Sequence, residues 1–487
     1  MPLLRWLPLA LITLAALWLR THDLARRPMH ADEANQAVKL GELLDHGHYA
    51  FDPRDHHGPT LYYAAVPVAW IRGERTLAQL SETTVRLVPA LFGTLAVVLL
   101  ALLAAPLGRW PAFAAAGLLA LSPPAVYYSR YFIQETLLAT FMLTVVVCAQ
   151  TWWRTGLTRW AIAAGVCAGL MQATKASAPL FLITALIALG FSRWGYLSRP
   201  PATRRPRRDV VVGLLAALGS AAVLYSSFGT HISGIRDALG AYTHALTRFG
   251  AAAAPTGHEK AWWYYLRMFG WYREGGLVWH QVAFSALALA GLGVAVFRAD
   301  RFLRGVAFYT VAIIAAFSFF AYKTPWHTVH FVPGLALLAA AALAEMGRLR
   351  TGRLAAAAFT LIVAATLFQQ TWRTSFLRAS DQRNPYAYVH SSADVMKYRA
   401  LAEAAAARSP DAPIRVISEE YWPLPWYLRG MPQVGYWTSP PDDCTGALII
   451  TSPTLADVVR ARLRGSHRES ILGLRPGVFN LVFTPEP

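Results

Sequence analysis

The chain has 487 residues, of which 55% are hydrophobic and only 15% are charged. Soluble proteins carry about 25% charged residues, so the composition excludes an ordinary soluble domain and indicates a membrane protein. The formal net charge is +18, but the basic residues lie in short clusters between apolar runs. Because this distribution is typical of membrane topology, we expect no nucleic-acid partner.

The long apolar runs predict the membrane spans. A spanning helix needs roughly 20 apolar residues, and eleven stretches approach this length, so we expect about 11 spans and at most 13. Within the first run, the segment 7–19 is preceded by Arg5 and is not followed by an Ala-x-Ala cleavage signal, so we interpret it as a retained signal anchor. The runs lie near residues 3–21, 83–105, 110–128, 135–153, 160–174, 177–192, 210–229, 277–297, 305–322, 328–346 and 354–372.

The arginine clusters orient these spans. With eleven spans and a cytoplasmic N-terminus, the clusters all fall on the cytoplasmic side, as the positive-inside rule requires. A further span at residues 61–71 would move every cluster outside, so we interpret this short apolar segment as a juxtamembrane helix on the outer surface. The expected location is the inner (plasma) membrane. The clusters are Arg109, Arg154 and Arg159, residues 193–208, Arg298, Arg301 and Arg304, and Arg348, Arg350 and Arg353.

This topology divides the chain into a transmembrane domain, residues 1–372, and a soluble extracytoplasmic domain, residues 373–487. The second is predicted to be a small α/β domain, because helical and strand patterns alternate in it. A linker rich in proline and arginine, residues 199–208, is expected on the cytoplasmic side. Within the soluble domain the expected helices are 393–408 and 455–464, and the expected strands are 414–418, 447–451 and 478–483.

The two long outer loops are residues 22–82 and 230–276. In the first, residues 35–44 have the apolar spacing of an amphipathic helix, with Asp32 at the N-cap position and Gly47 at the end. The second is rich in aromatic side chains. We expect its stretch 262–274, with Trp262, Trp263, Trp271 and Tyr272, to cover a site or to hold an acceptor together with the soluble domain.

Polar and ionisable residues gather at the predicted outer ends of the spans. Such groups are costly at membrane depth and are usually retained for function or pairing. Acidic members are suited to accept a proton, and cationic members are suited to bind a phosphate. Together they predict a site for a lipid-phosphate substrate. The set comprises His30, Asp32, Glu33, Asp55, His56, His57, Arg130, Gln134, Glu135, Lys175, Lys323, Trp326 and His327.

Each of these residues also has a structural interpretation. For Asp32 the alternative is a role as N-cap only, and for Glu33 it is a structural pairing with Arg130. For Arg130 and Glu135 the alternative is a pair with each other at a helix end. For Lys175 and Lys323 it is an interfacial position from which the ammonium groups reach water.

A divalent metal is a further alternative, because His30, His56 and His57 lie near carboxylates. The spacing of these residues matches no strong metal-binding motif. The metal ligands, if any, would be His30 and His56. No other cofactor is expected.

Six motifs are distributed along nearly the whole chain. They are the Asp32-Glu33 pair, His57-Gly58-Pro59-Thr60-Leu61-Tyr62-Tyr63, residues 84–93 (TVRLVPALFG), residues 128–135 (YSRYFIQE), residues 322–326 (YKTPW) and residues 422–429 (WPLPWYLR). Through these motifs the sequence resembles the GT-C membrane glycosyltransferases. The resemblance is to the protein O-mannosyltransferases (glycosyltransferase family 39), to the lipid A aminoarabinose transferases and, through the last two motifs, to the flippase-activity-associated family of prokaryotic surface glycosylation.

The resemblance implies a polytopic enzyme that moves a sugar, mannose or a related hexose, from a polyprenyl-phosphate donor to a hydroxyl acceptor with inversion. The acceptor would be a protein, a glycan or a lipid of the cell envelope. The catalytic base or acceptor-orienting residue would be Asp32, with Glu33 beside it. The substrate and its phosphate would be bound by Arg130, Glu135, Lys175, Lys323, His57, Tyr63 and Trp326.

Two features of the resemblance leave alternatives open. The chain has His57-Gly58-Pro59 where the aminoarabinose transferases have Lys-Pro-Pro, which argues against a lipid A acceptor. The flippase-associated branch leaves room for a non-catalytic accessory or transport protein that binds lipid-linked sugars. That alternative gives no reason for the acidic pair.

Overall fold

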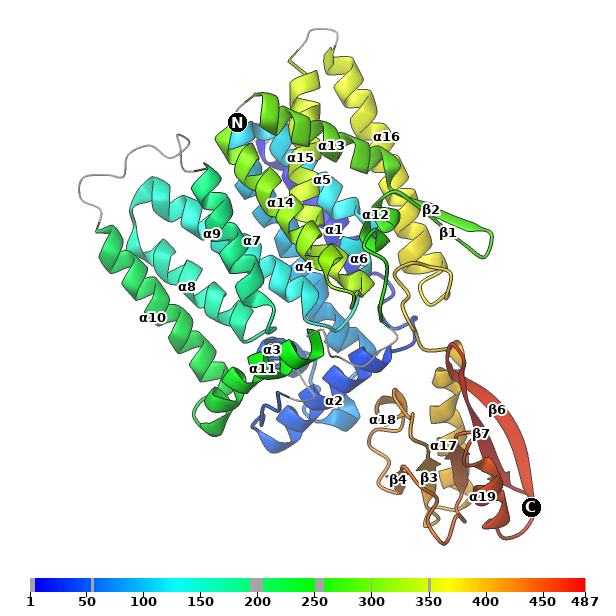
Figure 1. Ribbon diagram of the computed structural model, residues 1–487. Helices are drawn as coiled ribbons and strands as arrows, with labels where there is room; N and C mark the ends of the chain where they lie inside the picture. Colours follow the sequence, from blue (N-terminus) through cyan, green and yellow to red (C-terminus); the bar gives the residue numbers. More distant parts are fainter. Residues whose placement is uncertain are drawn as a thin grey trace. The chain divides into compact units, whose positions relative to one another are not determined.

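The computed structural model describes residues 5–53, 57–192, 205–249, 258–298, 300–348 and 352–486. It is predominantly helical, with a small sheet in the C-terminal part (Figure 1). The chain forms two compact units. The first unit contains residues 1–22, 48–65 and 86–379, and the second contains residues 23–47, 66–85 and 380–487.

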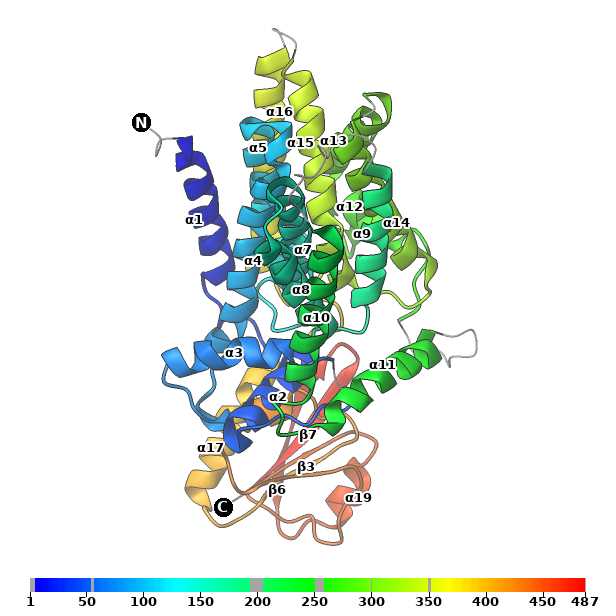
Figure 2. The same ribbon diagram turned by 90° about the vertical axis from the view of Figure 1, so that its left-hand side faces the viewer.

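The first unit is a bundle of apolar helices. Figure 2 shows α5, α15 and α16 running side by side in it. The helices are α1 (Leu7–Thr21), α3 (Thr60–Ile71), α4 (Glu82–Ala104), α5 (Arg109–Leu121), α6 (Pro123–Tyr128), α7 (Glu135–Thr155), α8 (Thr158–Gln172), α9 (Ala178–Ser192), α10 (Pro206–Tyr225), α11 (Ser233–Phe249), α12 (Tyr264–Phe269), α13 (Val282–Phe297), α14 (Arg301–Phe319), η4 (Pro325–His330), α15 (Val332–Met346) and α16 (Gly352–Trp372), with α3 and α4 extending into the second unit.

Six helical segments among the described residues are long and apolar enough to cross a membrane, which makes the protein a multi-pass membrane protein. A helix is present in every one of the eleven predicted spans, although the number of spans stays a prediction. The short apolar segment 61–71 is indeed helical, as α3. The spanning segments are Glu82–Leu107, Glu135–Thr155, Pro206–Tyr225, Arg301–Phe319, Pro325–Met346 and Gly352–Leu377.

The helix boundaries differ from the prediction in three places. The run 110–128 is divided at Ser122 into α5 and α6, because two consecutive prolines follow and cannot continue the first helix. The run 277–297 begins with strand β2 (Leu277–His280), which pairs with β1 (Trp271–Glu274) as a hairpin. Residues 199–204 of the predicted linker lie outside the described residues. Its last residues begin α10, where Pro206 occupies the first helical turn.

Close helix packing in this unit depends on small residues. A Cβ at Gly165 of α8 would lie 2.0 Å from the carbonyl oxygen of Gly213 in α10. A Cβ at Gly291 of α13 would lie 1.8 Å from the carbonyl oxygen of Leu338 in α15. Glycine is therefore required at both crossings, as in other membrane helix pairs that approach closely.

The second unit contains a five-stranded mixed sheet in the order β4-β3-β5-β7-β6. Strands β3 and β5 pair in parallel and are short and mostly buried, and all their residues except Arg415 and Thr451 are apolar, which is typical of parallel strands covered on both faces. The predicted strands are confirmed as β3, β5 and β7, but the sequence analysis missed the edge strands β4 and β6. The strands are β3 (Ile414–Ile417), β4 (Val434–Trp437), β5 (Leu448–Thr451), β6 (His467–Arg475) and β7 (Val478–Pro485).

The helices of this unit follow the predicted pattern with shorter bounds. The segment 393–408 is a 3₁₀ turn, η6 (Ala393–Met396), that leads into α17 (Lys397–Arg408). The segment 455–464 contains α19 (Ala456–Ala461). A short helix that was not predicted, α18 (Leu424–Tyr427), lies between β3 and β4.

The first outer loop contributes helix α2 (Ala31–His46) to the second unit. The predicted helix at 35–44 is thus confirmed, and Gly47 ends it with φ 74°, a conformation that glycine adopts without strain. The predicted N-cap was wrong: His30 caps the helix, and Asp32 lies inside the first turn.

Candidate active site

The two carboxylates in the first turn of α2, Asp32 and Glu33, differ in exposure and in contacts. Glu33 is fully buried, and both of its carboxylate oxygens lie 3.2 Å from Nη2 of Arg27. One of these oxygens also accepts the backbone N–H of His30 at 3.2 Å. Glu33 therefore closes a capping box and a buried ion pair, so its geometry is that of a positioning residue.

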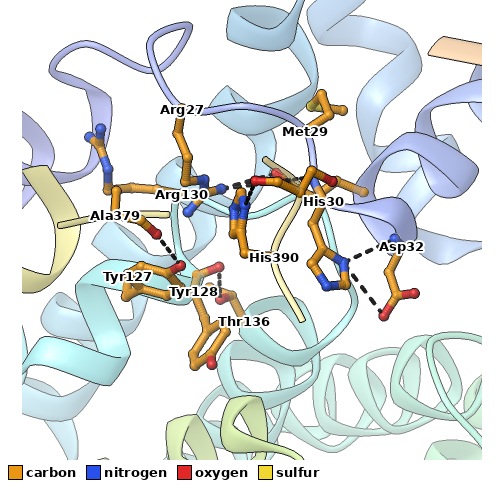
Figure 3. Close-up of polar contacts among 12 residues, drawn as sticks. Arg27, Met29, His30, Asp32, Tyr127, Tyr128, Arg130, Thr136, Ala379 and His390 are labelled. Carbon is orange, nitrogen blue, oxygen red and sulfur yellow. Dashed lines mark hydrogen bonds and ion pairs between the residues drawn. The ribbon is translucent and has the colours of Figure 1, made fainter. Parts of the chain in front are cut away.

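The Asp32 carboxylate remains accessible, with 53% of its side chain exposed. Its backbone N–H donates to Nδ1 of His30 at 3.0 Å, and its Oδ2 lies 3.9 Å from the same nitrogen (Figure 3). The first turn of a helix carries partial positive charge, which favours an anionic side chain there. Asp32 thus has an exposed carboxylate on a peptide whose N–H is bonded to His30.

The imidazole of His30 is held by two backbone groups. Because Nδ1 accepts the Asp32 amide, the proton is assigned to Nε2, which then donates to the carbonyl oxygen of Tyr388 at 3.1 Å. The ring contacts His390 edge-on, with 5.7 Å between the ring centroids. Burial, together with the positive charge of Arg27, holds the pKa of His390 well below its usual range, so this neighbour is neutral.

These contacts do not fit a metal site at His30, since protein groups engage both ring nitrogens. The described part of the chain contains no group of three or more His, Cys, Asp or Glu side chains arranged to hold a metal ion. His56, the other predicted ligand, lies outside the described residues.

The motif at residues 422–429 anchors the first-loop segments of the second unit. The Tyr427 hydroxyl accepts the backbone N–H of Met29 at 2.8 Å, three residues before Asp32. The indole of Trp426 donates to Glu82 at 2.7 Å. Arg429 stacks on Trp426 at 3.9 Å and donates to the carbonyl oxygen of Leu80 at 2.7 Å. The motif alone did not predict this role, which is to hold the acidic segment that contains Asp32 and Glu33.

In the first unit, Arg130 lies in the loop between α6 and α7 and is 5% exposed. Its Nη1 donates to the carbonyl oxygens of Leu19 at 3.2 Å and of His22 at 2.5 Å, at the C-terminal end of α1. Its guanidinium also lies 4.4 Å from the centroid of the Phe376 ring. A cation at this end of a helix is favourable. Neighbouring contacts tie the same loop down, including Thr136 Oγ1 to the Tyr128 carbonyl oxygen at 3.0 Å (Figure 3).

Glu135 and Lys175 form a buried ion pair between the first residue of α7 and the loop after α8. Only 3% of the Glu135 side chain and 13% of the Lys175 side chain are exposed. The carboxylate that the sequence analysis considered as a partner of Arg130 thus binds Lys175. The pair gives Lys175 a defined position in the unit.

The His57-Gly58-Pro59-Thr60 motif packs on the end of α8, just before Lys175. The Thr60 N–H donates to the carbonyl oxygen of Ala173 at 3.0 Å, and its hydroxyl donates to that of Leu170 at 3.1 Å. A Cβ at Gly58 would lie 2.2 Å from the Ala173 oxygen, so only glycine allows this approach. His57 itself is exposed.

Tyr63 lies on α3 and contacts the turn after α10. Its hydroxyl is 2.6 Å from Oγ of Ser227, which also accepts the Tyr49 N–H at 3.0 Å. Ser227 and Phe228 have φ angles of 49° and 56°, which residues other than glycine rarely adopt. The serine hydroxyl therefore joins three segments at a strained turn.

Lys323 and Trp326 lie before and within η4. The Lys323 ammonium donates to the carbonyl oxygens of Lys260, at 3.1 Å, and of Phe320. Burial lowers the pKa of Lys323. Trp326 is half-buried, and η4 packs against α6 and α7, the helices that flank Arg130.

The aromatic stretch 262–274 is not the loop that we predicted, because it contains α12 and strand β1. Trp262, Trp263 and Trp271 are all more than half exposed. Tyr272 lies 4.2 Å from the guanidinium of Arg267. An aromatic surface is thus present, and its binding of an acceptor stays a prediction.

Comparisons with known proteins agree with this architecture. A family model described as dolichyl-phosphate-mannose-protein mannosyltransferase matches residues 65–203. The crystal structure of ArnT from Cupriavidus metallidurans bound to undecaprenyl phosphate has 15% identity and a TM-score of 0.68, over 98% of this chain and 97% of that one.

A second similar structure is the archaeal oligosaccharyltransferase AglB from Archaeoglobus fulgidus, in complex with an inhibitory peptide and a dolichol-phosphate. It has 13% identity and a TM-score of 0.56, over 92% of this chain and 69% of that one. No curated protein sequence matches the chain. The protein therefore has the fold of these two structures, a helical bundle with a small C-terminal sheet, as the sequence predicted.

Proposed function

We propose that the protein is an inverting glycosyltransferase that uses a polyprenyl-phosphate sugar on the extracytoplasmic side of the inner membrane. The observation that carries the proposal is the exposed Asp32 carboxylate, which the buried Glu33 and His30 contacts hold at the start of α2. The GT-C fold and the mannosyltransferase family match support the reaction class.

The proposed step is a single displacement at the anomeric carbon. Asp32 takes the proton of the acceptor hydroxyl, or aligns that hydroxyl, while its oxygen bonds to the anomeric carbon. The bond from this carbon to the phosphate oxygen breaks, and polyprenyl phosphate leaves with the electron pair. Because phosphate is a good leaving group, no strong general acid is needed. Attack on the face opposite the phosphate inverts the anomeric configuration.

Cationic side chains are proposed to stabilise the charge that develops on the phosphate. Arg130, Lys175 and Lys323 are the candidates. The two lipid-bound structures carry undecaprenyl phosphate and dolichol-phosphate, which supports a donor of this class. We assign Glu135 a positioning role, since its ion pair sets the place of Lys175.

Three further residues are assigned to substrate binding. We propose that His57, Tyr63 and Trp326 contact the donor or the acceptor. The proposed acceptor is a protein, a glycan or a lipid. A mannose-like hexose is the proposed sugar, because the matching family acts on dolichyl-phosphate mannose. The N-terminus is proposed to be cytoplasmic and the C-terminal domain extracytoplasmic.

The test uses purified protein in detergent with a panel of labelled polyprenyl-phosphate hexoses, and it follows the release of free polyprenyl phosphate with and without a chelator. Wild type is expected to release the lipid phosphate, by transfer or by slow hydrolysis, and Asp32→Asn is expected to release none. Glu42→Gln is the matched control, because Glu42 is another accessible carboxylate of α2. Donor binding by both Asp32 forms without release by either would instead favour a flippase-associated protein.

A further inference from the structure

The contacts of His30 go beyond what a helix cap requires. The usual N-cap residues are Ser, Thr, Asp and Asn, whose short side chains accept one backbone N–H of the first turn. His30 accepts the Asp32 N–H through Nδ1, as they would. In addition, its Nε2 reaches the carbonyl oxygen of Tyr388 in the C-terminal segment of the second unit. A short cap would satisfy the amide without reaching Tyr388.

The two hydrogen bonds of the imidazole assign its tautomer. His30 is 5% exposed, its ring lies against the ring of His390, and its Nδ1 lies 3.9 Å from the Asp32 carboxylate. Nδ1 can accept the Asp32 N–H only when it carries no proton, so the neutral ring with the proton on Nε2 satisfies both bonds. The ring therefore links the peptide of Asp32 to the tail through two hydrogen bonds.

We infer that His30 is a positioning residue that aims the Asp32 carboxylate, by tying the Asp32 peptide to the backbone of Tyr388. This inference rests on the proposed function. The geometry supports this role: the backbone N–H of Asp32 is bonded to His30, which holds the peptide that carries the side chain, and the carboxylate itself stays 53% exposed. Pre-set orientation of a reacting group contributes to rate rather than to substrate affinity.

The experiment compares His30→Ala and His30→Asn with wild type in the full-length protein. Hydrogen exchange of the peptide that covers residues 30–36 reports the hold on α2 without any substrate. Steady-state release of polyprenyl phosphate reports kcat and KM. Tyr398→Phe is the stability control, because it removes the bond from Asn480 to the Tyr398 hydroxyl in the core of the same unit and leaves both bonds of the His30 ring in place.

His30→Ala is expected to raise amide exchange in the first turn of α2 at least about tenfold, and to lower kcat about tenfold with KM within about twofold. His30→Asn restores the acceptor for the Asp32 N–H but not the bond to Tyr388, so it should recover exchange protection and part of kcat. Tyr398→Phe should lower the melting temperature and leave both readouts at their wild-type values.

Unchanged exchange in His30→Ala would overturn the inference. So would a kcat that stays at the wild-type value while exchange rises, or a kcat loss that Tyr398→Phe reproduces at equal stability. Failure of wild type to release lipid phosphate with any donor would instead remove the proposed function. The exchange measurement would still decide whether His30 holds Asp32.

Discussion

The acidic segment of the second unit, with Asp32 and Glu33, and the cationic residues of the first unit differ in which of their groups the protein binds. In the acidic segment the protein binds the Glu33 carboxylate and the backbone of Asp32, and the Asp32 carboxylate stays exposed. In the first unit, Arg130, Lys175 and Lys323 all bind acceptors of the protein itself.

The difference has a physical basis. A group that removes a proton must be reachable, whereas a buried cation without an acceptor would be costly. A phosphate that binds Lys175 has to compete with Glu135, or share the lysine with it. We therefore expect changes at Asp32 to affect turnover, and changes at the cations to affect donor affinity. The predictions below test this contrast, beginning with the largest expected effect.

Asp32→Asn should lower turnover by about 10²–10⁴-fold, the usual contribution of a positioned general base. The amide keeps the size of the side chain and the backbone bond to His30, so the fold should be intact. Initial rates of polyprenyl phosphate release measure the loss. A comparable loss in Glu42→Gln would show that removing any carboxylate of α2 lowers turnover, and it would contradict a specific role of Asp32.

Glu33→Gln should act on stability first. It leaves Arg27 as a buried cation with its carboxylate removed, a change that costs about 3–5 kcal/mol in other buried pairs. Thermal unfolding of the detergent-solubilised protein measures the effect. The double variant Arg27→Met with Glu33→Gln should recover part of the loss. If Glu33→Gln keeps wild-type stability and loses turnover as Asp32→Asn does, Glu33 is a catalytic residue instead.

The buried His390 should make the second unit sensitive to acid. Its native pKa lies below the ordinary value of about 6.5, so the unfolded chain binds a proton that the native chain does not. Its contribution to stability is present above pH 6.5. It should fall by up to about 1.4 kcal/mol per pH unit below that point, until the native pKa is reached. Melting temperatures between pH 7.5 and 5.5 measure this, and His390→Gln should show the flatter profile. Equal slopes would contradict the assignment.

Tyr427→Phe should have the smallest effect, about 1 kcal/mol, because it removes one hydrogen bond to the Met29 N–H and keeps the ring. Hydrogen exchange of residues 26–32 should rise modestly. No change there would show that the tail does not hold the acidic segment through this contact.

Local patterns made much of the architecture predictable. The apolar spacing between residues 35 and 44 predicted α2, and Gly47 predicted its end, because both signals lie within the helix itself. The strand at 447–451 was evident because a buried parallel strand is a nearly continuous apolar run. The strand at 414–418 was evident because Ile414, Val416 and Ile417 are β-branched. Edge strands β4 and β6, which are partly exposed, give no such run.

The site depended on partners far apart in the sequence. Asp32 and Glu33 are neighbours, but they project about 100° apart around a helix. The positions of Arg27 and of the C-terminal segment, residues 380–487, decide which of the two carboxylates is buried. The pairing of Lys175 with Glu135 spans 40 residues, and Arg130 reaches carbonyls more than 100 residues away. The cap could not be predicted from propensity, since histidine is not a usual N-cap residue.

The most direct test measures donor affinity and turnover together for Asp32→Asn and Lys175→Gln, with the polyprenyl-phosphate hexose that wild type uses best. For Asp32→Asn we expect a donor Kd within about twofold of wild type and a turnover at least about 100-fold lower. For Lys175→Gln we expect a donor Kd at least about tenfold weaker, the loss of one charge-assisted contact. Asp32→Asn that turns over normally, or that fails only because it no longer binds the donor, would contradict the assignment of the chemistry to Asp32.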